Sequence, residues 1–130
     1  MGKTQTNQKK EKINDILRGD IFLVSFDPTI GHEIKKTRPA LVIQNNIGNQ
    51  YNTVIIVAAI TSKISPIPNP VEVVIESNSG NGLNNRSAIR LDQIRTVDRR
   101  RLLKFLGRTD GEIMAQVNQS LEISLGLAEL

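Results

Sequence analysis

The hydrophobic pattern of the chain changes period once, near Thr109, and this change limits the fold more than any other feature. Up to that point, short β-rich apolar runs alternate with segments rich in Gly, Pro and Asn. Beyond it, apolar residues recur at helical spacing, at Ile113, Val117, Leu121 and Leu125. Thr109 and Glu112 fit a capping box, which predicts where the helix begins. The pattern predicts a mainly β (α+β) domain: a small, SH3-like, strongly bent antiparallel barrel with a C-terminal α-helix.

Six apolar runs are expected as strands: residues 19–26, 40–44, 53–60, 71–76, 87–97 and 102–107. The run at 53–60 is apolar on both faces, which is typical of a central strand. Pro39 is expected at the first residue of its strand, because proline has no N–H to donate to a ladder. Glu72 and Glu76 are expected to face away from the apolar side chains of their run. The Asn-rich segment 45–52 is expected to turn.

A chain of 130 residues has room for one domain. Residues 1–17 are polar and lysine-rich, so we interpret them as a flexible basic extension and residues 18–130 as the domain. With no cysteine and one histidine, the chain has no disulfide framework or thiolate chemistry, and we expect neither metal nor cofactor. It has no run of about 18 apolar residues and no apolar signal stretch, so we expect a cytoplasmic protein without a membrane span.

The net charge of +4 is unevenly distributed. Residues 19–109 carry twelve Lys or Arg and seven Asp or Glu, whereas residues 110–130 carry four acidic residues and no Lys or Arg. This asymmetry indicates a polyanion-binding face away from the C-terminal segment. The alternative is that the charge serves solubility alone.

One loop carries several residues able to act on a phosphate group: His32, Glu33, Lys35, Lys36 and Arg38. Arg38 stands where this loop enters a strand, so its backbone should be well fixed. A guanidinium group in that place can bind a phosphate with two hydrogen bonds. The alternative is a solvated loop charge, and a single loop histidine is equally compatible with solvation or proton transfer.

Two further pairs can carry chemistry. Arg90 and Asp92 are two apart on an expected strand and therefore project from one face, with Cα atoms roughly 6.5–7 Å apart. They can serve phosphoryl chemistry as a cation and a proton acceptor, or form a surface ion pair of little consequence. Thr61 and Ser62 end the expected central strand, where hydroxyl groups can donate to a phosphate oxygen, although such residues end many strands.

Nucleic-acid binding has further candidates in the basic residues that follow. These are Arg95, Arg99, Arg100, Arg101, Lys104 and Arg108, which cannot all face one side of an extended chain. Aromatic residues make up only 3% of the chain, so base stacking must use few side chains. Tyr51, in an expected loop, is the best candidate.

The order of these motifs resembles the MazF/PemK (Kid) toxin family of type II toxin–antitoxin systems. RGDIFLVSFDPTIGHE is similar to the family's opening, and RPALVIQNN, VAAITS, RLDQIRTVD and LEISLGL follow in the family's order. The match covers roughly residues 18–127. The resemblance implies a homodimer of the CcdB/PemK-like fold that cleaves single-stranded RNA at short sequences without metal. It also implies an antitoxin of the MazE/PemI kind, with which the toxin binds operator DNA.

The resemblance also implies roles for particular residues. Relatives of the MazF branch use the arginine of the R-P motif and the threonine ending the central strand, which correspond to Arg38 and Thr61. Relatives of the PemK/Kid branch add a loop His and Glu and the R-x-D pair, which correspond to His32, Glu33, Arg90 and Asp92. Ser62, Lys35, Lys36, Tyr51 and Arg95 are then expected to bind RNA.

A mechanism consistent with these residues uses the RNA's own 2′-hydroxyl group as the nucleophile. Asp92 is expected to be the base, with Glu33 in reserve and His32 as an auxiliary. Arg38 is expected to stabilise the phosphorane with help from Arg90, because arginine stays protonated. Two alternatives remain: a CcdB-like toxin that binds gyrase and cuts nothing, and a catalytically inactive corepressor that acts with its antitoxin.

Overall fold

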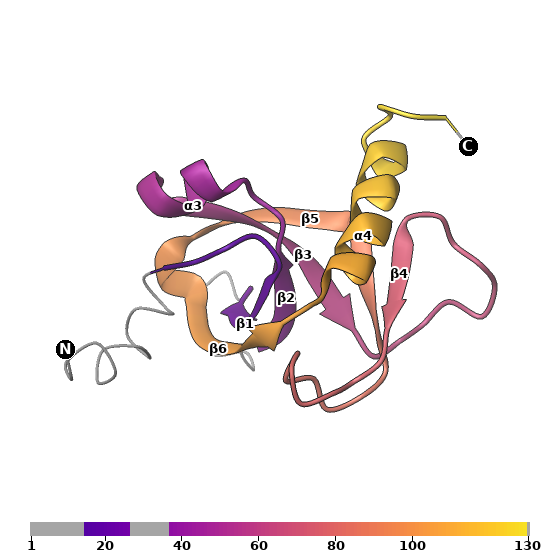
Figure 1. Ribbon diagram of the computed structural model, residues 1–130, viewed down its shortest axis with the longest axis horizontal. Helices are drawn as coiled ribbons and strands as arrows, with labels where there is room; N and C mark the ends of the chain where they lie inside the picture. Colours follow the sequence, from indigo (N-terminus) through magenta and orange to yellow (C-terminus); the bar gives the residue numbers. More distant parts are fainter. Residues whose placement is uncertain (1–14, 27–36, 130) are drawn as a thin grey trace, which may run out of the picture.

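The computed structural model describes residues 15–26 and 37–129 (Figure 1). Its strands are β1 (Asp20–Ser25), β2 (Thr37–Val42), β3 (Val54–Thr61), β4 (Glu72–Ile75), β5 (Ser87–Asp98) and β6 (Leu102–Arg108). Its helices are α3 (Asn46–Tyr51) and α4 (Gly111–Ser124), with a 3-10 turn η1 (Arg99–Arg101) between β5 and β6. The extension expected at residues 1–17 lies mostly outside the described residues. Neither described α-helix combines the length and apolarity needed to cross a membrane.

The strands form one antiparallel sheet in the order β4-β5-β3-β2-β1-β6. The mainly β fold with a C-terminal helix is therefore confirmed, and β3 lies inside the sheet as expected. The sheet does not close into a complete barrel, because among the described strands β4 and β6 do not pair. The loop between β4 and β5 bridges this gap instead, since the Arg108 N–H donates to the Gly80 carbonyl oxygen at 2.9 Å.

Apolar side chains from both faces of the sheet form two buried clusters. On β1, Ile21 belongs to the cluster that packs beneath α4, whereas Phe22 and Val24 belong to the second cluster. The same division on β3 places Ile60 in the first cluster and Ile55 in the second. Because both faces of these strands are buried, their sequences show apolar runs instead of strict alternation.

Helix α4 begins one residue later than the sequence predicts. Asp110 is the N-cap, and its side chain accepts from the Ile113 N–H at 2.9 Å, so the Thr109 capping box is wrong. Asp at the N-cap uses the same physical device, with a carboxylate in place of a hydroxyl. The helix lies along β4 and β5 (Figure 1), and its residue Val117 is fully buried in the first cluster.

A short helix replaces the turn expected at 45–52. Asn45 caps α3 by accepting from the Gly48 N–H at 2.7 Å. Asn49 is fully buried, and its side-chain amide donates to the Gln44 carbonyl oxygen at 2.9 Å. Asparagine is thus used here for capping and for a buried hydrogen bond, which composition alone does not distinguish from a turn.

The R-G-D segment at the start of β1 has a structural role. Arg18 donates through Nε to the Ile43 carbonyl oxygen and through Nη2 to Asn118 Oδ1, both at 2.8 Å. Its partial burial lowers its pKa through desolvation. Asp20 is fully buried and pairs with Arg108 at 2.8 Å. These contacts attach the beginning of the domain to β6 and to α4.

Candidate functional site

A cavity opens where β2 and β3 separate. The ladder between these strands ends at the pair Ala40↔Ala59. The next residue toward the start of β2 is Pro39, which has no N–H and pairs only with β1. Pro39 is thus the third residue of its strand and not the first, as the sequence predicted. Beyond this point the strand ends diverge around a cavity of about 600 Å³.

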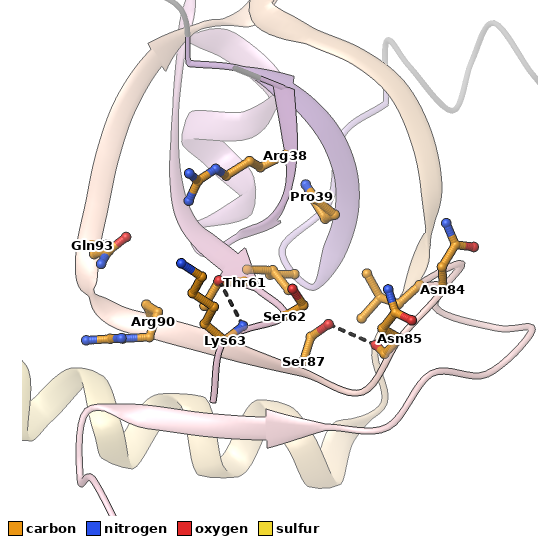
Figure 2. Close-up of a pocket in the computed structure, with 12 residues that line it drawn as sticks. Arg38, Pro39, Thr61, Ser62, Lys63, Asn84, Asn85, Ser87, Arg90 and Gln93 are labelled. Carbon is orange, nitrogen blue, oxygen red and sulfur yellow. Dashed lines mark hydrogen bonds between the residues drawn. The ribbon is translucent and has the colours of Figure 1, made fainter. Parts of the chain in front are cut away.

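Residues from three strands and two loops line this cavity (Figure 2). They are Arg38, Pro39, Ile60, Thr61, Ser62, Lys63, Leu83, Asn84, Asn85, Ser87, Arg90 and Gln93. Figure 2 shows Arg38 across the cavity from Thr61, with Arg90 and Gln93 on one side and Asn84 and Asn85 on the other. Of the predicted site residues, the structure therefore brings together Arg38, Thr61, Ser62 and Arg90.

A bulge in β5 shapes one wall of the cavity. Consecutive residues of β3, Ala58 and Ala59, pair with Ile94 and Arg90, so residues 91–93 have no partner on β3. Residues three apart on a regular strand face opposite sides of the sheet, yet Arg90 and Gln93 both line this cavity. The bulge therefore turns the side chains of Arg90 and Gln93 toward the same cavity.

The Arg38 guanidinium group lies in the cavity (Figure 2). Arg38 is exposed, and its side chain makes no hydrogen bond or ion pair with another described residue. It lies opposite Thr61, whose Oγ1 accepts from the Lys63 N–H at 3.1 Å (Figure 2). That contact fixes the Thr61 oxygen and leaves its hydroxyl hydrogen available to a ligand oxygen. Ser62 is exposed beside it.

Arg90 and Asp92 form the pair that the sequence predicts, with two parallel hydrogen bonds. Arg90 donates from Nε to Asp92 Oδ1 at 3.0 Å and from Nη2 to Oδ2 at 2.8 Å. Hydrogen bonding to Arg90 lowers the pKa of Asp92, and the same interaction raises the pKa of Arg90. Asp92 itself does not line the cavity. Its carboxylate is directed to Arg90, which favours a role in holding that arginine.

The two glutamates of the apolar run at 71–76 differ in their exposure. The Glu72 side chain is only 4% exposed, whereas that of Glu76, at the other end of the same apolar run, is 71% exposed. Glu72 lies beneath the loop that follows β3, where Ser65 Oγ donates to it at 3.1 Å. Glu72 is therefore buried because a loop covers this end of β4.

A smaller cavity of about 200 Å³ continues from the first and shares Arg38 and Gln93 with it. Arg95 and Phe26 line this extension. The Arg95 guanidinium carbon lies 5.2 Å from the centre of the Phe26 ring, a cation–π contact that holds the arginine in place. The smaller cavity thus connects Arg95 to the main cavity.

The remaining predicted residues do not meet in this cavity within the described structure. Tyr51 is 75% exposed on α3, which precedes β3, whereas Thr61 ends that eight-residue strand. The structure therefore does not bring Tyr51 to the cavity. The other predicted residues lie outside the described part of the chain: His32, Glu33, Lys35 and Lys36.

Five polar lining residues are not identified by the sequence: Lys63, Asn84, Asn85, Ser87 and Gln93. The Asn-rich run at 78–85 indicates only a hairpin turn, and its amides carry no separate signal. Together these residues surround the cationic centre with hydrogen-bond donors and acceptors, which suits an anionic ligand that also carries polar groups. Within residues 15–26 and 37–129, no three His, Cys, Asp or Glu side chains lie together as metal ligands do.

The fold and the site define a small, mainly β protein with an open cavity suited to a phosphodiester. Comparison with known families gives a match over residues 17–125 to the PemK-like, MazF-like toxin of type II toxin–antitoxin systems. The chain belongs to this toxin family.

Individual relatives agree with the family match. The chain is 40% identical over 114 residues to the endoribonuclease EndoA of Bacillus subtilis, covering 88% of this chain and 97% of that protein. It is 42% identical over 110 residues to the endoribonuclease MazF of Staphylococcus saprophyticus, covering 85% and 91%. A crystal structure of MazE–MazF from Deinococcus radiodurans contains a chain with 25% identity and a TM-score of 0.73, covering 88% and 98%.

Proposed function

We propose that this protein acts as a toxin by cleaving single-stranded RNA at specific short sequences, without a metal ion, and so inhibits translation and growth. The observation that carries the proposal is the convergence of Arg38, Thr61 and Ser62 with Arg90 on one cavity. A guanidinium group without a described partner, opposite two hydroxyl groups, is an arrangement that binds a phosphodiester. Membership of the toxin family and the names of the two endoribonuclease relatives support the same activity.

The reaction uses the 2′-hydroxyl group next to the scissile phosphate. Its oxygen attacks phosphorus, the bond from phosphorus to the 5′-oxygen breaks, and the products carry a 2′,3′-cyclic phosphate and a 5′-hydroxyl. A base removes the proton of the 2′-hydroxyl group, and a proton donor protonates the departing 5′-oxygen. The nucleophile is already part of the substrate, so the protein has to orient the linkage and stabilise charge.

Arg38 has the leading part in charge stabilisation. Its exposed guanidinium group can meet the negative charge that develops on the phosphoryl oxygens in the transition state. Thr61 and Ser62 donate hydroxyl hydrogens to a phosphate oxygen and orient it. Arg90, anchored by Asp92, adds positive charge to the same wall.

The base is assigned by elimination among the predicted carboxylates. Asp92 is the first candidate from the sequence, but its two oxygens accept from Arg90 and its lowered pKa makes it a weaker base. We therefore assign Asp92 to the orientation of Arg90. Glu33 becomes the preferred base, with His32 as an auxiliary.

RNA beyond the scissile linkage is bound by groups around the cavity. Arg95 extends the cationic surface through the smaller cavity, and Lys35 and Lys36 add charge from the segment that precedes Arg38. Asn84 and Asn85 present amides able to hydrogen-bond the edges of unpaired bases. Tyr51 remains a stacking candidate for more distant nucleotides.

In the cell, the protein is proposed to act in the cytoplasm as a homodimer controlled by an antitoxin of the MazE/PemI kind. The similarity of the chain to the MazF of the Deinococcus radiodurans MazE–MazF structure supports such a partner. The complex of toxin and antitoxin is proposed to bind operator DNA.

Cleavage of a long RNA followed by mapping of the new ends tests the proposal. The wild-type protein should give cuts at one short sequence with 5′-hydroxyl ends. Arg38→Ala should lower the cleavage rate by about 10²–10³-fold while the protein remains folded, because a transition-state donor is lost. Arg86→Ala is the matched control and should cleave normally, since Arg86 does not line the cavity and its side chain pairs with Glu76.

Two changes of conditions test the chemistry. A 2′-deoxyribose at the scissile nucleotide should prevent cleavage. If that substrate is cleaved, the 2′-hydroxyl group is not the nucleophile. Excess EDTA should leave the rate unchanged. If the wild-type protein cuts no RNA, the gyrase-binding and corepressor alternatives become the candidates, and binding to gyrase or to the antitoxin–operator complex separates them.

A further inference from the structure

Glu72 carries a buried carboxylate to which the proposed mechanism gives no part. It is the first residue of β4, and its side chain is 4% exposed. Removing a carboxylate from water is costly unless other groups hydrogen-bond to it or neutralise it. The contacts of Glu72 therefore indicate what the buried charge does.

These contacts connect Glu72 to two elements that line the cavity, the loop after β3 and strand β5. From the loop after β3, the Ser65 N–H lies 3.3 Å from each carboxylate oxygen, and Ser65 Oγ donates to Oε2 at 3.1 Å. This loop begins with Ser62 and Lys63, which line the cavity. From the neighbouring strand, Arg90 Nη1 lies 3.8 Å from Oε2.

Strand pairing fixes the second contact. Glu72 and Arg90 are directly paired in the ladder between β4 and β5, so their backbones hold the two side chains at the same level of the sheet. Asp92 binds the Nε and Nη2 edge of the guanidinium group, while Glu72 faces Nη1. Asp92 thus hydrogen-bonds the guanidinium group while Glu72 lies at ion-pair distance from its other edge, and the Arg90 side chain is left 20% exposed.

We propose that Glu72 is a positioning residue, which fixes the Arg90 guanidinium plane in the cavity wall and ties the loop carrying Ser62 and Lys63 to it. The inference rests on the proposed ribonuclease function for its catalytic consequence only. Glu72 does not line the cavity and touches no substrate. Its effect passes through Arg90, which lines the cavity.

A matched control lies four residues away on the same chain. Glu76 is also a glutamate, and it pairs with Arg86 at 2.8 Å, but these two side chains are 71% and 59% exposed. An exposed pair of this kind contributes little to structure. Glu72→Gln and Glu76→Gln therefore make the same chemical change in a buried and a solvated setting.

The experiment combines kinetics with a spectroscopic measurement that needs no cleavage. On the full chain, the ¹⁵N–¹H heteronuclear NOE of the Arg90 Nε–Hε group reports how rigidly the guanidinium group is held. In the wild type and in Glu76→Gln it should be high, and in Glu72→Gln it should fall. With an oligoribonucleotide that contains the mapped cleavage sequence, Glu72→Gln should lower kcat roughly 10- to 100-fold with little change in KM, because misplacing a group by about 1 Å has an effect of this order.

Each outcome decides the matter. An unchanged NOE in Glu72→Gln overturns the inference, and so does a lowered NOE with an unchanged kcat. If Glu72→Gln does not fold, Ser65→Ala replaces it: this variant keeps the charge, removes one donor to Glu72, and should lower both the NOE and kcat to a smaller extent. If the wild type cuts no RNA, the proposed function fails, and the NOE comparison alone decides whether Glu72 positions Arg90.

Discussion

Gly107 lies where the loop between β4 and β5 crosses the open side of the sheet. A Cβ atom at this position would lie 2.6 Å from the carbonyl carbon of Asn81 and 2.8 Å from its Cα, and would also overlap the Gly80 carbonyl oxygen. All of these are backbone atoms, so no side-chain rotation relieves the overlap. Gly107→Ala therefore forces the loop away from β6.

The cost has two parts. Overpacking of a buried site costs about 1–3 kcal/mol. Displacing the loop also strains or breaks the hydrogen bond from the Arg108 N–H to the Gly80 carbonyl oxygen, which contributes about 0.5–1.5 kcal/mol. The free energy of unfolding should fall by about 2–4 kcal/mol in total, which corresponds to a decrease in Tm of roughly 6–20 °C for a chain of this size.

Thermal unfolding followed by circular dichroism measures this difference. Gly111→Ala is the control, because a Cβ there meets nothing within 4 Å. This second variant should unfold at the wild-type temperature or slightly above it, since alanine restricts the unfolded chain more than glycine does. If Gly107→Ala changes the free energy of unfolding by less than about 0.5 kcal/mol, the loop does not press on β6 and does not bridge the sheet.

Two further predictions concern the acidic partners of arginines. Asp92→Asn should lower kcat by only about tenfold and keep the acidic limb of the pH–rate profile, because Asp92 orients Arg90. If kcat instead falls by more than about 10²-fold and the acidic limb disappears, Asp92 is the base. Asp98 accepts hydrogen bonds from Arg100, and this interaction lowers the pKa of Asp98 from 3.8 to about 2. The pair therefore stabilises the folded state above pH 3.8, and this stabilisation is lost as the pH falls to about 2. The difference in Tm between the wild type and Asp98→Asn should thus be present at pH 7 and disappear near pH 2, and a difference that is constant with pH would contradict this.

The strands could be predicted because their apolar patterns are local. Each expected run overlaps a strand of the structure, and the central position of β3 followed from its two apolar faces. Closure of the barrel could not be predicted in the same way, because it depends on whether the two edge strands reach one another. In this protein the loop between β4 and β5 packs on β6 at Gly80 and Gly107, a contact that hydrophobic periodicity does not record.

The site was predictable in part for a related reason. Arg38, Thr61 and Arg90 were identified by residue type and order along the chain, and the structure brings them to one cavity. The partners of these residues depend on pairing between distant segments. The burial of Glu72 beneath its loop and the contribution of Asn84 both result from such pairing, so neither had a signal in the local sequence.

The bulge in β5 has a consequence for how this protein family can vary. Residues 91–93 are accommodated between two consecutive ladder pairs of β3. Leu91 is fully buried in the core and Asp92 holds Arg90, so only a length change beside Gln93 would alter which side chain lines the cavity while leaving these contacts in place. Substrate preference can therefore diverge through chain length at one strand, without any substitution among the residues that perform the chemistry.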